Sequence, residues 1–188
     1  MGPESSDEGA GVPLATSLAL AIESDGLPAR ADLHLRLGRE LQRKGDLVQA
    51  LGHYLRVAQL EPTSVAAWCG IGSTMEDRNH FEDALVAYRR ALDIAPDVPE
   101  THCRLGRAYL RAEKLPEAAA SLHAALRLKP DLAEAWNALG SVEEMQGNLA
   151  QATAHKRQAI GIDPTLADAY AGLPHTGDGA LDDGVPAP

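Results

Sequence analysis

Two short segments of the chain carry three arginines each, at the spacing of a single helix face. They are Arg36, Arg39 and Arg43 in one segment, and Arg104, Arg107 and Arg111 in the other. Residues three and four apart lie on the same side of a helix, so each trio would present its guanidinium groups together. A guanidinium offers a planar fork of donors that matches a carboxylate in two parallel hydrogen bonds. The chemistry indicated is recognition of carboxylates, in a chain whose own formal net charge is −10.

The elements that must position these arginines belong to a repeat. Four prolines stand 34 residues apart, at Pro62, Pro96, Pro130 and Pro164. This interval divides the chain into units 31–64, 65–98, 99–132 and 133–166, with proline at position 32 of each. Position 8 is always glycine and position 20 always alanine, as Gly38, Gly72, Gly106, Gly140, Ala50, Ala84, Ala118 and Ala152. A repeat array presents a surface to partners rather than a closed catalytic pocket.

The second unit carries the fullest motif, with Trp68, Ile71, Gly72, Ala84, Tyr88 and Pro96. Over residues 31 to about 173, this pattern resembles the tetratricopeptide repeat (TPR) family, whose signature includes W-x₂-L-G-x₂-Y, A-x₃-F and a closing proline. His34 and His102 depart from it where the aromatic residue usually stands, and Lys156 departs where the second unit has Tyr88. The resemblance implies an all-α fold, a right-handed superhelical solenoid of stacked antiparallel helix pairs.

The residues support the same fold on physical grounds. Each unit shows two amphipathic stretches, about 99–112 and 115–128 in the third unit, with apolar residues at helical spacing. Glycine at position 8 and alanine at position 20 leave little side chain between the two helices, and the proline cannot continue the second helix. Gly45-Asp46, Asn79 and Gly147-Asn148 separate the helices of three units. One unit cannot bury its apolar face alone, so neighbouring units must stack.

The two ends differ from the repeats in composition. Residues 1–12 and 174–188 are acidic, rich in Gly, Pro and Ser, and are expected to be disordered. Residues 13–30 are interpreted as a capping helix or a degenerate half repeat, and residues 167–173 as a partial helix. The end without a full cap could associate with another subunit or be covered by the tail. The chain has no apolar run long enough for a membrane span and no basic leader, so we expect a cytoplasmic protein.

Other residues capable of chemistry form no complete site. Cys69 and Cys103 share position 5 of neighbouring units, about 8–10 Å apart on stacked helices, so two free thiols are expected rather than a disulfide. His102 beside Cys103 lacks two further metal ligands. The Gly70-Ile71-Gly72 stretch lacks the third glycine and preceding strand of a dinucleotide loop. We therefore expect no enzyme activity, no metal and no cofactor.

The family resemblance implies where a ligand would bind. In this family the first helix of each repeat lines a concave groove, mainly through positions 2, 5, 6, 9, 12 and 13. Carried over, these positions predict a peptide-binding surface of Arg36, Arg39, Arg43, Ser73, Asp77, Arg104, Arg107, Arg111, Asn137 and Ser141. The carboxylate clamp of heat-shock co-chaperones is absent, because only Arg104 matches its residues. An alternative is that the arginines pair internally, with Asp77 between Arg43 and Arg111, and Glu40 beside Arg36.

Two hypotheses of different classes follow. The first is a non-catalytic adaptor or scaffold that binds an extended, acidic or C-terminal carboxylate-bearing peptide in its arginine-lined groove. The second is an accessory repeat module of an enzyme, for example a transferase, whose catalytic part is a separate subunit or domain. The acidic tail, with Asp178, Asp182 and Asp183, could also occupy a groove. Overall acidity and few aromatic residues argue against a nucleic acid partner.

Overall fold

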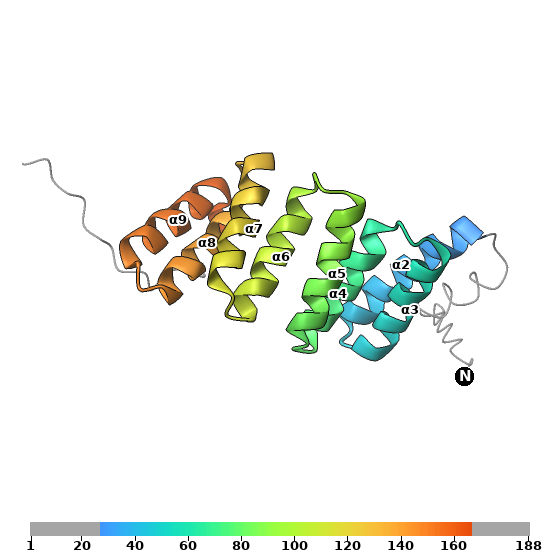
Figure 1. Ribbon diagram of the computed structural model, residues 1–188. Helices are drawn as coiled ribbons and strands as arrows, with labels where there is room; N and C mark the ends of the chain where they lie inside the picture. The colour runs from blue at the N-terminus through green and yellow to red at the C-terminus, as the bar shows by residue number, and fades with distance from the viewer. Residues whose placement is uncertain (1–26, 167–188) are drawn as a thin grey trace, which may run out of the picture.

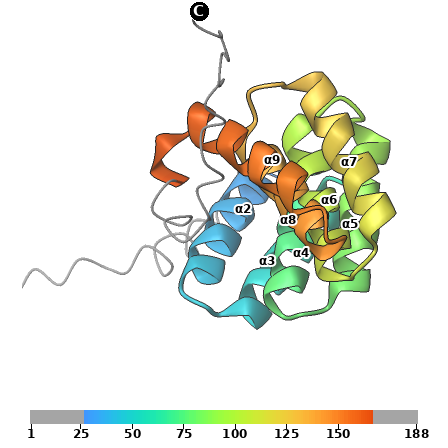
Figure 2. The same ribbon diagram turned by 90° about the vertical axis from the view of Figure 1, so that its left-hand side faces the viewer.

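The computed structural model describes residues 27–166, and in this range all regular secondary structure is helical. In order the helices are α2 (Leu27–Arg43), α3 (Leu47–Leu60), α4 (Val65–Asp77), α5 (Phe81–Ile94), α6 (Pro99–Arg111), α7 (Leu115–Leu128), α8 (Ala133–Met145) and α9 (Leu149–Ile162), followed by the short 3₁₀ helix η1 (Pro164–Leu166). Successive helices form antiparallel pairs, and the pairs stack in chain order (Figure 1). Viewed from the α9 end, the pairs follow a curved path (Figure 2).

The all-α solenoid of stacked helix pairs predicted from the sequence is confirmed. Helix α2 begins at Leu27, so residues 27–30 continue the first helix of the array rather than belonging to a separate cap. The other expectations for the ends, over residues 1–26 and 167–188, lie outside the described residues. Among the described helices, none is both long and apolar enough to cross a bilayer.

Inside each helix pair, the glycine at position 8 of the first helix lies directly against the side chain at position 24 of the second. A Cβ added to Gly72 would lie 2.7 Å from the ring of Tyr88, and one added to Gly106 would lie 2.6 Å from Cγ of Leu122. Gly38 meets Tyr54 and Gly140 meets Lys156 in the same way. Distances under 3 Å are too short for carbon atoms, so only glycine lets the position-24 side chain lie directly on the backbone of the first helix.

A second contact in each pair joins position 24 to position 12 of the first helix. Tyr54 Oη donates to Gln42 Oε1 at 3.1 Å in the first repeat, and Tyr88 Oη donates to Glu76 Oε2 at 2.6 Å in the second. In the fourth repeat the buried Lys156 ammonium binds Glu144. The third repeat places leucine at both positions, as Leu110 and Leu122. Lys156 therefore replaces the usual aromatic residue by supplying both bulk and a donor that reaches an acceptor.

The turn inside each pair has the same backbone conformation in all four repeats. Position 15 has a positive φ in each of them: Gly45 (83°), Asn79 (60°), Glu113 (58°) and Gly147 (83°). The next amide donates back to the carbonyl five residues earlier, as in Lys114 N to Tyr109 O at 2.9 Å. This is the Schellman ending of a helix, in which glycine or asparagine normally takes the left-handed residue. Glu113 adopts this left-handed conformation although it has a side chain. The third repeat therefore has no glycine or asparagine from which the turn could be predicted.

Neighbouring repeats are joined by a donor at position 4 that reaches the closing proline of the preceding repeat. Trp68 Nε1 donates to the carbonyl of Pro62 at 3.0 Å, and Trp136 Nε1 to that of Pro130 at 2.8 Å. His102 Nε2 lies 2.7 Å from the carbonyl of Pro96. A carbonyl only accepts, so this nitrogen carries the hydrogen. His102 thus performs the same bonding as tryptophan, which explains this departure from the family pattern.

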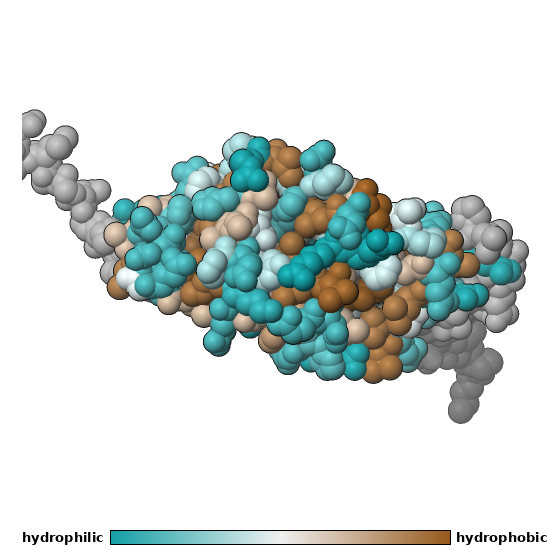
Figure 3. All heavy atoms as spheres, viewed as in Figure 1, coloured by the Kyte–Doolittle hydropathy of each residue, from teal (hydrophilic) through white to brown (hydrophobic). Residues whose placement is uncertain are grey.

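The outer surface carries no large apolar area on the face seen in Figure 3, where hydrophobic residues lie in small groups among hydrophilic ones. Among residues 30–166, six large hydrophobic side chains are exposed: Val48, Leu55, Val86, Leu128, Met145 and Leu149. Leu149 is 67% exposed, whereas Leu47, Phe81 and Leu115, at the same motif position, are half-buried. Scattered exposure of this kind is ordinary for a folded chain.

The glycine contact predicts opposite effects for two matched substitutions. Gly72→Ala should lower the free energy of unfolding by about 1–3 kcal/mol, because the new methyl group meets the fully buried Tyr88 ring. Gly52→Ala, in the exposed middle of α3 with nothing within 4 Å, should raise it by about 0.5–1 kcal/mol through helix propensity. Urea denaturation of both variants measures the difference. Equal changes would refute the contact.

The strained turn predicts a stabilising substitution. Glu113→Gly should raise the free energy of unfolding by about 0.5–1 kcal/mol, because glycine adopts φ of 58° without clash. Glu117→Gly, a matched change within helix α7, should lower it by about as much. Thermal melts followed by circular dichroism compare the two variants, and destabilisation by Glu113→Gly would contradict the strain.

Candidate functional site

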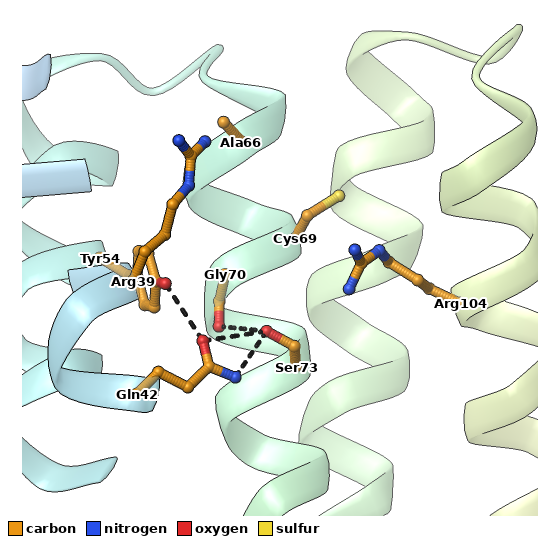
Figure 4. A pocket seen from close by; sticks show the side chains of 8 residues that line it. All are labelled: Arg39, Gln42, Tyr54, Ala66, Cys69, Gly70, Ser73 and Arg104. Atoms are coloured by element: carbon orange, nitrogen blue, oxygen red, sulfur yellow. Dashed lines mark hydrogen bonds between the residues drawn. The ribbon is translucent and has the colours of Figure 1, made fainter. Parts of the chain in front are cut away.

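A cavity of about 340 Å³ opens among the first helices of the first three repeats. It is lined by Arg39, Gln42, Tyr54, Ala66, Cys69, Gly70, Ser73 and Arg104, and is called here the arginine cavity. Figure 4 shows Arg39 rising from α2 on one side, while Arg104 points from α6 toward α4 on the other. Gly70 is needed here, because a Cβ on it would lie 2.5 Å from the Tyr54 ring. The sequence-predicted Arg39, Ser73 and Arg104 are therefore brought together.

The floor of the arginine cavity is a hydrogen-bonded polar group. Gln42 Nε2 donates to Ser73 Oγ at 3.1 Å and to Asp77 Oδ2 at 2.7 Å, while Gln42 Oε1 accepts from Tyr54. The Gln42, Ser73 and Tyr54 bonds are drawn in Figure 4. Burial raises the pKa of the Tyr54 hydroxyl above its usual value, and the nearby Arg39 and Arg104 act in the opposite direction. The hydroxyl therefore stays a neutral donor at physiological pH.

Arg104 interacts electrostatically with Glu100 and donates a hydrogen bond to the Tyr88 hydroxyl, but neither arginine of this cavity is held in an ion pair by a described residue. No acidic side chain of residues 27–166 forms an ion pair with Arg39 or Arg104. Both side chains are exposed at the cavity, and no acidic residue lines it. An anion entering the cavity would meet two guanidinium groups, while the nearest carboxylate of the floor, Asp77, is bound to Gln42 and does not line the cavity.

Of the other four predicted arginines, two form ion pairs within the chain, though not with the partners that the sequence suggested, and one lies over an aromatic ring. Arg43 binds Glu40 at 2.8 Å, Arg107 lies 3.8 Å from Glu134, and Arg111 lies over the Phe81 ring at 5.1 Å. Arg36 is exposed and lines neither of the two groove cavities described here. The internal pairing expected of Asp77 with Arg43 and Arg111 is wrong, because Asp77 accepts from Gln42 instead. The pairing of Glu40 with Arg36 is also wrong, because Glu40 is bound by Arg43 and Lys44.

A second cavity, of about 290 Å³, opens among α4, α6 and α8. Its lining is Glu76, Arg107, Leu110, Arg111, Glu134, Asn137, Ala138, Ser141 and Leu166, and it is called here the leucine cavity. It brings together four more of the predicted residues, Arg107, Arg111, Asn137 and Ser141. Asp77, Arg36 and Arg43 line neither this cavity nor the first.

The two cysteines are free thiols in different surroundings. Cys103 is buried, and burial raises the pKa of its thiol to about 11, so it stays protonated and inert. Cys69 is half-buried, lines the arginine cavity, and lies 3.5 Å from Thr101 Oγ1. Among residues 27–166, no three His, Cys, Asp or Glu side chains are grouped closely enough to hold a metal ion.

Ten of the seventeen residues that line the two cavities were not in the predicted peptide-binding set. They include Gln42, Tyr54 and Cys69 of the arginine cavity, and Leu110 and Glu134 of the leucine cavity. Gln42 and Leu110 stand at position 12, which the family resemblance had already assigned to the groove, so that signal was present in the sequence. Tyr54 comes from a second helix and reaches the groove only because Gly70 leaves room for it. Leu166 stands at position 34 of the fourth unit, in η1, and the family resemblance did not assign that position to the groove.

Comparison with known proteins identifies the architecture. Two tetratricopeptide repeat models match the sequence, one over residues 103–167 and another over residues 76–113. The chain is a tetratricopeptide repeat protein. A comparison with curated protein sequences found no match.

Solved structures of other tetratricopeptide repeat proteins have the same fold. A crystal structure of MamA is 19% identical, with a TM-score of 0.69 over 82% of this chain and 89% of that one. MamA from Desulfovibrio magneticus RS-1 is 17% identical, with a TM-score of 0.65 over 82% and 97%. TTC0263, a thermophilic TPR protein of Thermus thermophilus, is 21% identical, with a TM-score of 0.70 over 84% and 85%. At these identities the likeness concerns the fold.

The first tetratricopeptide repeat departs from the others at position 4. His34 Nδ1 lies 2.7 Å from His53 Nδ1 of α3, with ring centroids 5.0 Å apart. Burial is the main cause that lowers the pKa of both imidazoles, and the nearby Arg30 and Arg56 lower that of His34 further. One Nδ1 must donate and the other accept, so a doubly charged pair would lose this hydrogen bond.

This pair predicts a pH dependence of stability. The folded pKa values lie below the unfolded value of about 6.5, so the unfolded chain binds more protons as pH falls through that value. The free energy of unfolding should therefore fall from pH 7.5 to pH 5.5. Replacing both residues with glutamine should remove most of that change. Urea midpoints at the two pH values measure the change in stability. If the double variant lost as much stability as the unmodified chain, the pH dependence would come from other groups.

Proposed function

We propose that this chain is an interaction scaffold that binds an acidic segment of a partner polypeptide in the groove formed by its first helices. The observation that carries the proposal is the arginine cavity, in which Arg39 and Arg104 line one space and neither forms an ion pair with a carboxylate of residues 27–166. Repeats of this family generally mediate protein–protein binding and are generally non-catalytic.

In this proposal, binding depends on hydrogen bonds between the two guanidinium groups and a charged group of the ligand. A carboxylate of the ligand accepts from the Arg39 and Arg104 guanidinium groups, each hydrogen bond to a charged group being worth about 1.5–3 kcal/mol. The Ser73 hydroxyl and the Gln42 amide line the same space, but their donors already bind groups of the chain, so the two arginines supply the contacts to the carboxylate. A chain of net charge −10 repels acidic segments at long range, so recognition depends on this local cationic space.

The proposal is tested with a defined peptide pair. One is a fluorescein-labelled twelve-residue Gly/Ser peptide with a central Asp-Asp, and its control has Asn-Asn. Fluorescence anisotropy should show that the Asp-Asp peptide binds at least about tenfold more tightly, and that Arg39→Gln/Arg104→Gln abolishes the difference. Arg90→Gln, an exposed change on α5 away from both cavities, should leave it intact. Equal affinity for both peptides would refute the proposal.

Cys69 supplies an independent report of where the peptide lies. In the Cys103→Ala variant it is the chain's single thiol. Saturating Asp-Asp peptide should slow alkylation of Cys69 by iodoacetamide, because the thiol lines the proposed site. An unchanged rate alongside tight binding would move the site out of the arginine cavity.

A further inference from the structure

The two groove cavities are built from the same motif positions, two repeats apart. The arginine cavity uses positions 9 and 12 of the first repeat and positions 2, 5, 6 and 9 of the second. The leucine cavity uses positions 9 and 12 of the third repeat and positions 2, 5, 6 and 9 of the fourth. Arg39 thus corresponds to Arg107, and Ser73 to Ser141, each 68 residues later.

The sequence alternates with the same two-repeat period. Position 4 reads His34, Trp68, His102 and Trp136, and position 9 reads Arg39, Ser73, Arg107 and Ser141. Arginine at position 6 in odd repeats becomes glycine or alanine in even ones, as Gly70 and Ala138. Gly70 lines the same cavity as Arg39 and Arg104, and Ala138 lines the same cavity as Arg107. Each cavity thus combines small residues of an even repeat with arginines of odd repeats.

Their chemistry differs at the corresponding positions. Position 12 is Gln42 in the arginine cavity and Leu110 in the leucine cavity, and position 2 is Ala66 in one and Glu134 in the other. Glu134 lies 3.8 Å from Arg107 and partly neutralises it. Leu166 adds a second apolar wall to the leucine cavity.

The remaining charges of the leucine cavity already have contacts within the chain. Glu76 accepts from Tyr88 Oη at 2.6 Å, and Arg111 lies over the Phe81 ring. A charged ligand group placed there would be desolvated beside charges that are already engaged, which is unfavourable. An apolar side chain would instead contact Leu110, Ala138 and Leu166.

We infer that the two cavities bind one extended segment of a partner polypeptide, with a carboxylate in the arginine cavity and an apolar side chain in the leucine cavity. This inference rests on the proposed function and specifies the ligand further. Adjacent packed helices lie about 8–10 Å apart, so sites two repeats apart are separated by roughly 16–20 Å. An extended chain rises about 3.3 Å per residue, so about five or six residues separate the two anchoring side chains.

The inference is tested by adding leucine to the Asp-Asp peptide at defined spacings. Leucine five or six residues from Asp-Asp, on one side or the other, should tighten binding about tenfold over serine at the same place. Leucine two residues from Asp-Asp is the matched control and should give no gain, because it cannot reach the second cavity. Fluorescence anisotropy measures all the peptides against the full chain.

Two equivalent substitutions separate the cavities. Ser141→Phe fills the leucine cavity and should abolish the leucine gain while leaving Asp-Asp binding intact. Ser73→Phe fills the arginine cavity at the same motif position and should weaken every Asp-Asp peptide. Circular dichroism checks that both variants fold. If Ser141→Phe does not fold, Leu166→Ser is used instead, because Leu166 lies at the end of the array and outside the core clusters. That variant should reduce the leucine gain.

The outcomes distinguish the two proposals. If no Asp-Asp peptide binds better than its Asn-Asn control, the proposed function fails. If Asp-Asp binding is present but leucine gives no gain at five or six residues on either side, the present inference fails alone. A leucine gain that survives both Ser141→Phe and Leu166→Ser would also overturn it, since the leucine would then bind elsewhere.

Discussion

The structure depends on the contact between the glycine at position 8 and the large side chain at position 24. In every repeat this contact sets how closely the two helices approach, and it holds for a tyrosine, a leucine or a lysine on the opposite helix. Because the glycine has no side chain, the neighbour packs on backbone and its polar end reaches position 12. The helix pair so fixed is the unit that stacks, and the groove is the surface left by the first helices.

Much of the fold could be predicted because the repeat signals each element four times. Proline at position 32 and glycine at position 8 act locally, through a missing N–H and a missing Cβ, so the sequence alone indicates their effect. The turn at Glu113 could not be recognised, because its left-handed backbone is imposed by the packed helices on either side. His102 illustrates the same difficulty, since its bond to the Pro96 carbonyl is visible only in three dimensions.

The candidate site was predicted in part. Family positions identified Arg39, Ser73 and Arg104, which line one cavity together. Their partners could not be predicted, because ion pairing depends on side-chain reach between helices: Asp77, expected to bind arginines, accepts from Gln42. The contrast between arginines that are paired and arginines that are not became apparent only once these contacts were known, and it is the basis of the proposed function.

The bond between positions 12 and 24 links the interior of each repeat to the chemistry of its groove. A tyrosine at position 24 requires an acceptor at position 12, so Tyr54 in the core goes with polar Gln42 in the arginine cavity. Leu122 accepts nothing and donates nothing, so position 12 of that repeat can be Leu110, which adds an apolar wall to the other cavity. The core residue at position 24 thus limits which residue can stand at position 12, and through it which ligand groups the groove can bind. A repeat evolving toward a new partner would have to exchange an interior residue together with a surface one, and neither substitution alone would be neutral.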